Sequence, residues 1–152
     1  VIISCMDSRT SAELVFDQGL GDIFSIRVAG NIINEDILGS AEFACKVVGA
    51  KVVLVLGHSK CGAIQGAISN VQLGHLHFIT RKIQRCIHPG QSGKDSKASL
   101  TDLMESVTRD NVIRGIQDLR SSSTILAQME HEKKIQIVGG VYDVTSGKVD
   151  FM

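Results

Sequence analysis

The hydrophobic pattern of the chain contains two short runs that are apolar on both faces. These runs are Val1 to Ile3 and Val52 to Leu56, and most of their residues are β-branched. Strands that are buried on both faces show this pattern, whereas half-exposed strands alternate apolar and polar residues. The two runs therefore predict central strands of a parallel sheet.

Elsewhere, apolar residues recur with the spacing of amphipathic helices. The periodicity predicts helices over residues 11–18, 35–48, 62–71, 73–85 and 110–131, the last broken near residues 121–123. Further strands are predicted over residues 22–28 and 135–138, and residues 141–144 and 149–151 are predicted to pair as a hairpin. Residues 91–99 are polar and show no periodicity, which predicts a surface loop.

Strands that alternate with helices are typical of α/β proteins. We therefore expect a single domain over residues 1–152, with a mostly parallel central sheet flanked by helices and a C-terminal hairpin at the edge of the sheet. A chain of 152 residues can bury roughly two thirds of the surface that it exposes when unfolded. It needs no disulfide framework to stabilise it.

Composition and charge argue against several classes of partner. Hydrophobic residues make up 43% and charged residues 21% of the chain, and 16 basic residues balance 16 acidic ones. A chain without net charge lacks the basic surface that nucleic acids and anionic membranes attract. The apolar runs are also shorter than the roughly 20 residues that a membrane span requires. We expect neither nucleic-acid binding nor a membrane span.

Cysteine usage indicates a reduced compartment. Two of the four cysteines stand beside Asp or His residues, which suits a metal better than a disulfide. We therefore expect a cytoplasmic protein. Because Val1 already lies within a predicted strand, we also expect residues upstream of it, and an organellar targeting segment among them stays open.

Metal-ligating residue types follow both of the central strands. Cys5 lies two residues beyond the end of the first apolar run, and His58 and Cys61 lie two and five residues beyond the end of the second. The carboxyl ends of neighbouring parallel strands face one crevice, so these three side chains can meet there. Thiolate sulfur and imidazole nitrogen are ligands that zinc prefers, and a catalytic zinc keeps a fourth position open. The pattern predicts one zinc ion per chain.

Asp7 and Arg9 lie next to the first of these cysteines and allow two interpretations. Asp7 could orient a water molecule on the metal or ligate the metal itself, and Arg9 could hold the Asp7 carboxylate by a bidentate pair. Alternatively, Asp7 only caps the helix that follows, and Arg9 is its surface partner. The nearby cysteines favour the first interpretation.

Several motifs resemble those of the β-class carbonic anhydrases. They are Cys-Met-Asp-Ser-Arg at residues 5–9, Gly-Asp-Ile-Phe at 21–24, Arg-Val-Ala-Gly-Asn at 27–31, Gly-His-Ser-Lys-Cys-Gly-Ala at 57–63, and the segment 137–149. The resemblance covers nearly the whole chain. The family also has a helical arm before its first zinc-binding Cys, which these 152 residues do not include.

The resemblance implies both an activity and the residues that carry it. Zinc-bound hydroxide would hydrate carbon dioxide reversibly to bicarbonate and a proton, as in a carbonate dehydratase. Cys5, His58 and Cys61 would bind the zinc, and Asp7 and Arg9 would form a catalytic dyad. The substrate pocket would lie beside Phe24, Ala29, Phe43 and the backbone amide of Gly62. A homodimer or tetramer is also implied.

Two alternatives stay open at this point. The same metal site could hydrolyse carbonyl sulfide or carbon disulfide, because access to the pocket decides the substrate. The chain could also be a zinc-stabilised, non-catalytic module of a longer protein. Asp7 and Arg9 argue against the module, because a structural zinc needs no open fourth position.

Overall fold

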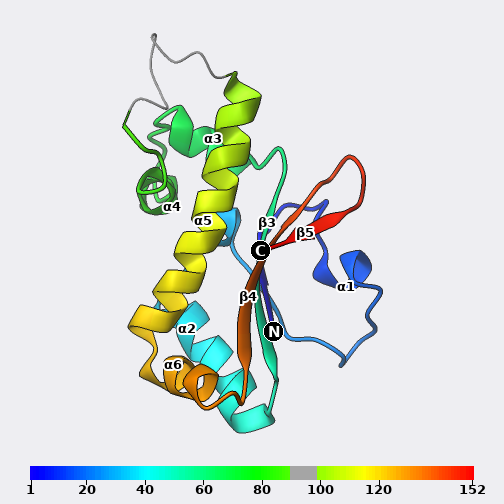
Figure 1. Ribbon diagram of the computed structural model, residues 1–152. Coiled ribbons are helices and arrows are strands. Elements are labelled where there is room, and N and C mark those ends of the chain that lie inside the picture. The colour runs from blue at the N-terminus through cyan, green and yellow to red at the C-terminus, as the bar shows by residue number, and fades with distance from the viewer. Residues whose placement is uncertain (90–98) are drawn as a thin grey trace.

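The computed structural model describes residues 1–89 and 99–152 and is built around one five-stranded sheet (Figure 1). The strands are β1 (Ile2–Ser4), β2 (Ser25–Arg27), β3 (Val52–His58), β4 (Gln136–Tyr142) and β5 (Val149–Phe151). Their order in the sheet is β2-β1-β3-β4-β5. β1 to β4 are parallel and β5 pairs antiparallel with β4, which confirms the predicted α/β fold and its edge hairpin.

The two strands with apolar residues on both faces occupy the middle of the sheet, as predicted. In their parallel register, Ile2 lies opposite Leu54 and Ile3 lies opposite Val55. All four side chains are buried. Because β1 and β3 are neighbours, the residues that follow them in the chain leave the sheet at the same edge.

Helices cover the two faces of the sheet unequally, with α1 alone on one face and the longer helices on the other (Figure 1). The helical elements are α1 (Ala12–Val15), the 3₁₀ turn η1 (Ala29–Asn31), α2 (Glu35–Glu42), the π-helical segment η2 (Phe43–Val48), α3 (Gly62–Ile68), α4 (Leu76–Gln84), α5 (Leu100–Ser122) and α6 (Thr124–His131). The long helix α5 packs against β3 and β4.

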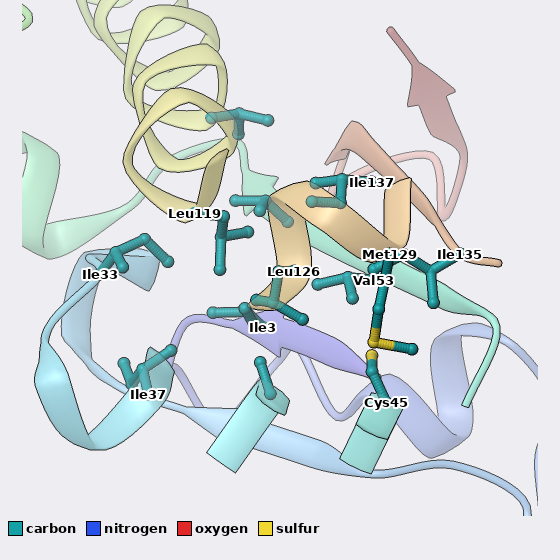
Figure 2. Close-up of a cluster of buried hydrophobic side chains, with 13 residues drawn as sticks. Ile3, Ile33, Ile37, Cys45, Val53, Leu119, Leu126, Met129, Ile135 and Ile137 are labelled. Atoms are coloured by element: carbon teal, nitrogen blue, oxygen red, sulfur yellow. The ribbon is translucent and has the colours of Figure 1, made fainter. Parts of the chain in front are cut away.

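The main core lies between the sheet and the helices α5 and α6. Figure 2 shows Leu119, Leu126 and Met129 of these helices beside Ile3 and Val53 of the sheet. A second cluster of buried side chains lies under α3 and α4 and includes Cys5 and Cys61. The cysteines expected to bind metal are therefore anchored in a packed core.

The helix predicted over residues 110–131 proves to be two helices and begins earlier. α5 begins at Leu100, where Ser99 and Asp102 form a reciprocal capping box, and the predicted break lies at Ser123. The buried residues Leu103 and Val107, together with Met104, extend the apolar stripe by two turns at helical spacing. The prediction of a start at Asp110 was wrong.

The strand predicted over residues 135–138 and the first half of the hairpin are one continuous strand, β4. Gly139 and Gly140 connect them without a turn. A Cβ atom on Gly139 would lie 2.7 Å from Val112 Cγ1, so this glycine permits close packing of α5 rather than a break in the strand.

Within the described residues, no helix combines the length and the hydropathy that crossing a membrane requires. The surface loop predicted over residues 91–99 lies outside the described residues, except for Ser99 at the start of α5.

Candidate metal centre

The structure brings Cys5, His58 and Cys61 together at the carboxyl edge of β1 and β3. Cys5 follows β1, His58 is the last residue of β3, and Cys61 is the N-cap of α3. Their ligand atoms all lie within 4.8 Å of one another, and the two sulfur atoms are 3.9 Å apart. All three side chains are buried. The geometry therefore allows all three to bind a single ion.

The His58 ring is oriented for metal binding. Its Nδ1 lies 2.9 Å from the carbonyl oxygen of Ser59, so Nδ1 carries the proton and donates it to that carbonyl. Nε2 is buried and has no hydrogen-bond partner in the described part of the chain. A buried nitrogen without a partner is costly unless a ligand satisfies it. Two thiols and one such nitrogen are a donor set that fits zinc.

The two thiols perturb each other strongly. The pKa of Cys5 is lowered, most of all by a hydrogen bond from the Cys61 thiol, and also by His58 and by the Gly30 amide. The pKa of Cys61 is raised, first because its thiol proton is held in the hydrogen bond to Cys5, then because the thiol is buried and its ionisation would place a second thiolate beside the first. A dication bound between them removes this conflict, since it stabilises both thiolates.

A buried hydrogen-bond chain supports Cys5 from behind. The Gly30 amide donates to Cys5 Sγ at 3.3 Å, and Asn111 Nδ2 of α5 donates to the Gly30 carbonyl at 2.8 Å. Gly30 has a φ of +67°, and a Cβ at this position would lie 2.6 Å from Ile83 Cδ1. Only glycine fits here without displacing its neighbours.

Asp7 lies beside the cluster and is held by Arg9. Arg9 Nε donates to Asp7 Oδ1 at 2.9 Å, and Arg9 Nη2 donates to Oδ2 at 2.7 Å, so the bidentate pair considered from the sequence is present. Asp7 Oδ2 is 4.0 Å from His58 Nε2. The Arg9 guanidinium holds the pKa of Asp7 well below its usual range, so this carboxylate is ionised.

Two further contacts fix the backbone around this pair. Arg27, at the end of β2, donates to the carbonyl oxygens of Cys5 and Asp7. Arg9 Nη2 also donates to the Lys60 carbonyl at 3.2 Å. The cluster and the Asp7–Arg9 pair are thus tied to three different strand ends.

The four residues implied to form a substrate pocket are not brought together within one chain. Gly62 follows Cys61, and Ala29 precedes Gly30, so both are close to the cluster in sequence. Phe24 and Phe43 line a separate surface groove that none of Cys5, His58 and Cys61 lines. Phe24 precedes β2, whereas Cys5 follows β1, so the two residues lie at opposite ends of parallel strands.

Sequence reasoning missed the residues that support the cluster through their hydrogen bonds. Asn111 carried a signal, because it occupies the buried stripe of α5 four residues after Val107 and four before Gly115. A polar residue within a buried stripe needs a hydrogen-bond partner. Ser59 gave no such signal, because it lies in an irregular turn.

Comparisons with known proteins agree with this geometry. The family model described as carbonic anhydrase matches residues 1–149. The chain is 34% identical over 152 residues to a carbonic anhydrase of Mycolicibacterium smegmatis, covering 99% of this chain and 72% of that protein. It is 33% identical over 150 residues to carbonic anhydrase 2 of Mycobacterium tuberculosis, covering 97% of this chain and 71% of that protein.

A solved structure supports the same assignment. The β-carbonic anhydrase CafA of Aspergillus fumigatus matches with a TM-score of 0.90 and 25% identity, covering 99% of this chain and 73% of that one. The resemblance seen in the motifs is confirmed by both sequence and fold. The chain belongs to the β-carbonic anhydrase family.

Proposed function

We propose that this protein catalyses the reversible hydration of carbon dioxide to bicarbonate and a proton, with one zinc ion held by Cys5, His58 and Cys61. The observation that carries the proposal is the position of Asp7. Its carboxylate is fixed by Arg9 and lies 4.0 Å from the unpartnered nitrogen of His58. A site that only stabilises the fold has no use for an ionised carboxylate in this place.

The chain supplies three ligands, Cys5, His58 and Cys61, that would hold a zinc ion. Zinc bound there would supply Lewis acidity that ionises a water molecule near neutral pH. The thiolates of Cys5 and Cys61 place two negative charges on the site, and these charges oppose the ionisation of water. Neighbouring groups must therefore favour that ionisation. Asp7 is the neighbouring group that can do so.

Asp7 can orient the attacking oxygen because its carboxylate stays ionised. An ionised carboxylate only accepts hydrogen bonds, and each oxygen has more than one acceptor position. Oδ2 can therefore accept from Arg9 and from a hydroxyl at the same time. Arg9 restrains the carboxylate on its far side, which keeps Asp7 from becoming a fourth metal ligand.

We further propose roles for Ala29 and Gly62 on the substrate side. Ala29 would form an apolar wall of the pocket next to the Gly30 turn. The Gly62 amide is the first of α3 and has no acceptor within the helix, so it can donate to the product anion. Phe24 and Phe43 would contribute only once another copy of the chain completes the pocket.

Association into a homodimer or tetramer is part of this proposal. Phe43, Val47 and Val48 are exposed by 55%, 71% and 55% on the segment η2, and Phe43 lines the same groove as Phe24. Contiguous exposed apolar side chains on a soluble domain mark an interaction surface. A second copy of the chain is the partner that the proposed family function favours.

Stopped-flow hydration of carbon dioxide by the Arg9→Ala and Asp7→Ala variants tests the proposal, with zinc measured in the same samples. Both variants should keep about one zinc per chain and lose activity about 10²-fold, the order of magnitude for one positioned catalytic group. In Arg9→Ala the loss follows because the freed Asp7 can ligate the metal.

The chain offers a closely matched control. Arg120 forms the same bidentate pair with Glu130, through Nε at 2.7 Å and Nη2 at 2.8 Å, at the same side-chain exposure of 48% as Arg9. Arg120→Ala should leave turnover unchanged. Near-normal turnover in zinc-replete Arg9→Ala would show that Asp7 and Arg9 only order the loop before α1, and the proposal would then fail.

A further inference from the structure

The turn between β3 and α3 supplies two backbone acceptors to the metal centre. The Ser59 carbonyl accepts from His58 Nδ1 at 2.9 Å and so sets the orientation of that ring. The Lys60 carbonyl accepts from Arg9 Nη2 at 3.2 Å. The placement of these two carbonyls therefore affects both a metal ligand and the arginine that restrains Asp7.

This turn cannot hold its shape by local backbone preference alone. Lys60 has a φ of +57°, which few residues other than glycine adopt without a cost. Ser59 and Lys60 also lie outside both β3 and α3, so regular secondary structure does not fix their conformation. Contacts from elsewhere in the fold must compensate.

The C-terminal hairpin provides these contacts through Ser59. Ser59 Oγ donates to Asp143 Oδ1 at 3.0 Å and accepts from the Val144 amide at 3.0 Å. The Ser59 amide donates to the Tyr142 carbonyl at 2.9 Å. One side chain is thus both donor and acceptor to the hairpin, which leaves the turn little freedom to rotate.

Asp143 is itself held rigidly within the hairpin. Its carboxylate accepts from the Thr145 amide at 2.9 Å and from Ser146 Oγ at 2.8 Å. These donors, with the Thr145 amide contributing most, lower the pKa of Asp143 to about 2. Asp143 is therefore a fixed, ionised acceptor for Ser59 at neutral pH.

We infer that Ser59 and Asp143 are positioning residues of the metal centre. By fixing the turn, they hold the Ser59 carbonyl against His58 and the Lys60 carbonyl against Arg9. The hairpin thereby controls both how tightly zinc is retained and whether Asp7 stays off the metal. This inference rests on the function proposed above, because it concerns the same zinc site and the same Asp7–Arg9 pair.

Zinc release provides the first test and needs no measurement of activity. The rate of zinc transfer to a chromogenic chelator should rise about 10- to 100-fold in Ser59→Ala and in Asp143→Ala, the range typical for residues that support metal ligands. Ser59→Thr keeps the hydroxyl and should restore slow release. Ser146→Ala removes another donor to the same carboxylate without affecting Ser59, and it should release zinc at the wild-type rate.

The contact with Arg9 provides the second test, through a double-mutant cycle on carbon dioxide hydration. Ser59→Ala should lower kcat about tenfold in the wild-type background, within the range for such supporting residues. In an Arg9→Ala background it should lower kcat no further, because the contact that it supports is already lost. Faster zinc release should persist in that background, since the contact with His58 is separate.

Two results would overturn the inference. One is zinc release within twofold of wild type in both Ser59→Ala and Asp143→Ala. The other is an equal, independent loss of kcat from Ser59→Ala with and without Arg9. Absence of carbon dioxide hydration in the wild-type protein, with zinc release still dependent on Ser59, would instead refute the proposed function and leave the link to His58 standing.

Discussion

The two ends of the sheet differ in how completely the contacts within one chain bury and hydrogen-bond their side chains. At the carboxyl end, the side chains around Cys5, His58 and Cys61 are joined by specific hydrogen bonds from β2, η1, α5 and the C-terminal hairpin. At the amino end, Phe43 lines a surface groove and is exposed by 55%. Val52, the first residue of β3, is exposed by 44%. One end is closed around polar contacts, and the other exposes large apolar side chains.

This difference separates two parts of the proposed function. The ligand cluster is assembled by a single chain, so metal binding should not depend on association. Phe24 and Phe43 lie apart from that cluster, so a pocket that uses them requires another copy. Variants at one end of the sheet should therefore affect zinc, and variants at the other end should affect association.

The largest effect is expected from removing a zinc ligand. Cys61→Ser should reduce zinc from about one per chain to a substoichiometric level, because two remaining ligands cannot complete the site. Cys45→Ser is the matched control, since Cys45 is also a buried cysteine but belongs to the main core. Metal analysis after dialysis decides the outcome, and one zinc per chain in Cys61→Ser would refute the assignment of the ligand.

A smaller effect is expected from Asn111, which supports Cys5 through Gly30. Asn111→Ala leaves the buried Gly30 carbonyl without its donor, which should lower the free energy of unfolding by about 1–3 kcal/mol. It should also weaken zinc binding about 10- to 100-fold, because the Gly30 amide is no longer held against the sulfur.

Competition with a chelator of known affinity measures the effect of Asn111→Ala on zinc. Thr80→Ala serves as the control, because Thr80 is equally buried but its hydroxyl bonds only to carbonyls of its own helix. Thr80→Ala should lower stability without changing zinc affinity. Equal loss of zinc affinity in both variants would mean that Asn111 acts only through general stability.

At the amino end, Phe43→Ala should weaken self-association about tenfold and leave zinc content unchanged, since truncating a well-buried interface aromatic costs more than 1 kcal/mol. Phe78 of α4 is exposed by the same 55% and serves as the control. Sedimentation over a concentration series measures the difference. An unchanged dissociation constant in Phe43→Ala, or an equal change in Phe78→Ala, would place the interface elsewhere.

Local sequence predicted the carboxyl end well, because the informative residues are close to strand ends. Cys5 and His58 adjoin runs that are apolar on both faces, and such runs become neighbouring central strands. The strand order itself placed the ligands at one edge. Phe24 was different, because it lies inside the strand predicted over residues 22–28. Only the structure, in which β2 begins at Ser25, places it at the opposite end of the sheet from Cys5.

The supporting contacts could not be predicted, because they join residues far apart in the chain. Asn111 and Gly30 are separated by 81 positions, and Ser59 and Asp143 by 84. The buried stripe of α5 marks Asn111 as a residue that needs a partner, but no pattern in the sequence identifies Gly30 as that partner or pairs Ser59 with Asp143. The early part of α5 was missed although the sequence carries its pattern, because Leu100, Leu103, Met104 and Val107 recur at helical spacing directly after Ser99.

The smallest effect concerns acid stability at the carboxyl end. The pKa of Asp143 is lowered to about 2 in the folded protein, mainly by the Thr145 amide, from an ordinary value near 3.9 in the unfolded chain. A lowered carboxylate pKa contributes stability that is fully present above the unfolded pKa and is lost as the pH falls through the folded one. The contribution should therefore be constant above about pH 5 and disappear between about pH 4 and pH 2.

Urea unfolding midpoints of wild type and Asp143→Asn across this range measure the contribution of the Asp143 charge. A chelator is present in both samples, so that zinc release does not affect the midpoints. The two midpoints should converge as the pH falls. A difference that stays constant down to pH 2 would show that the charge of Asp143 does not stabilise the hairpin.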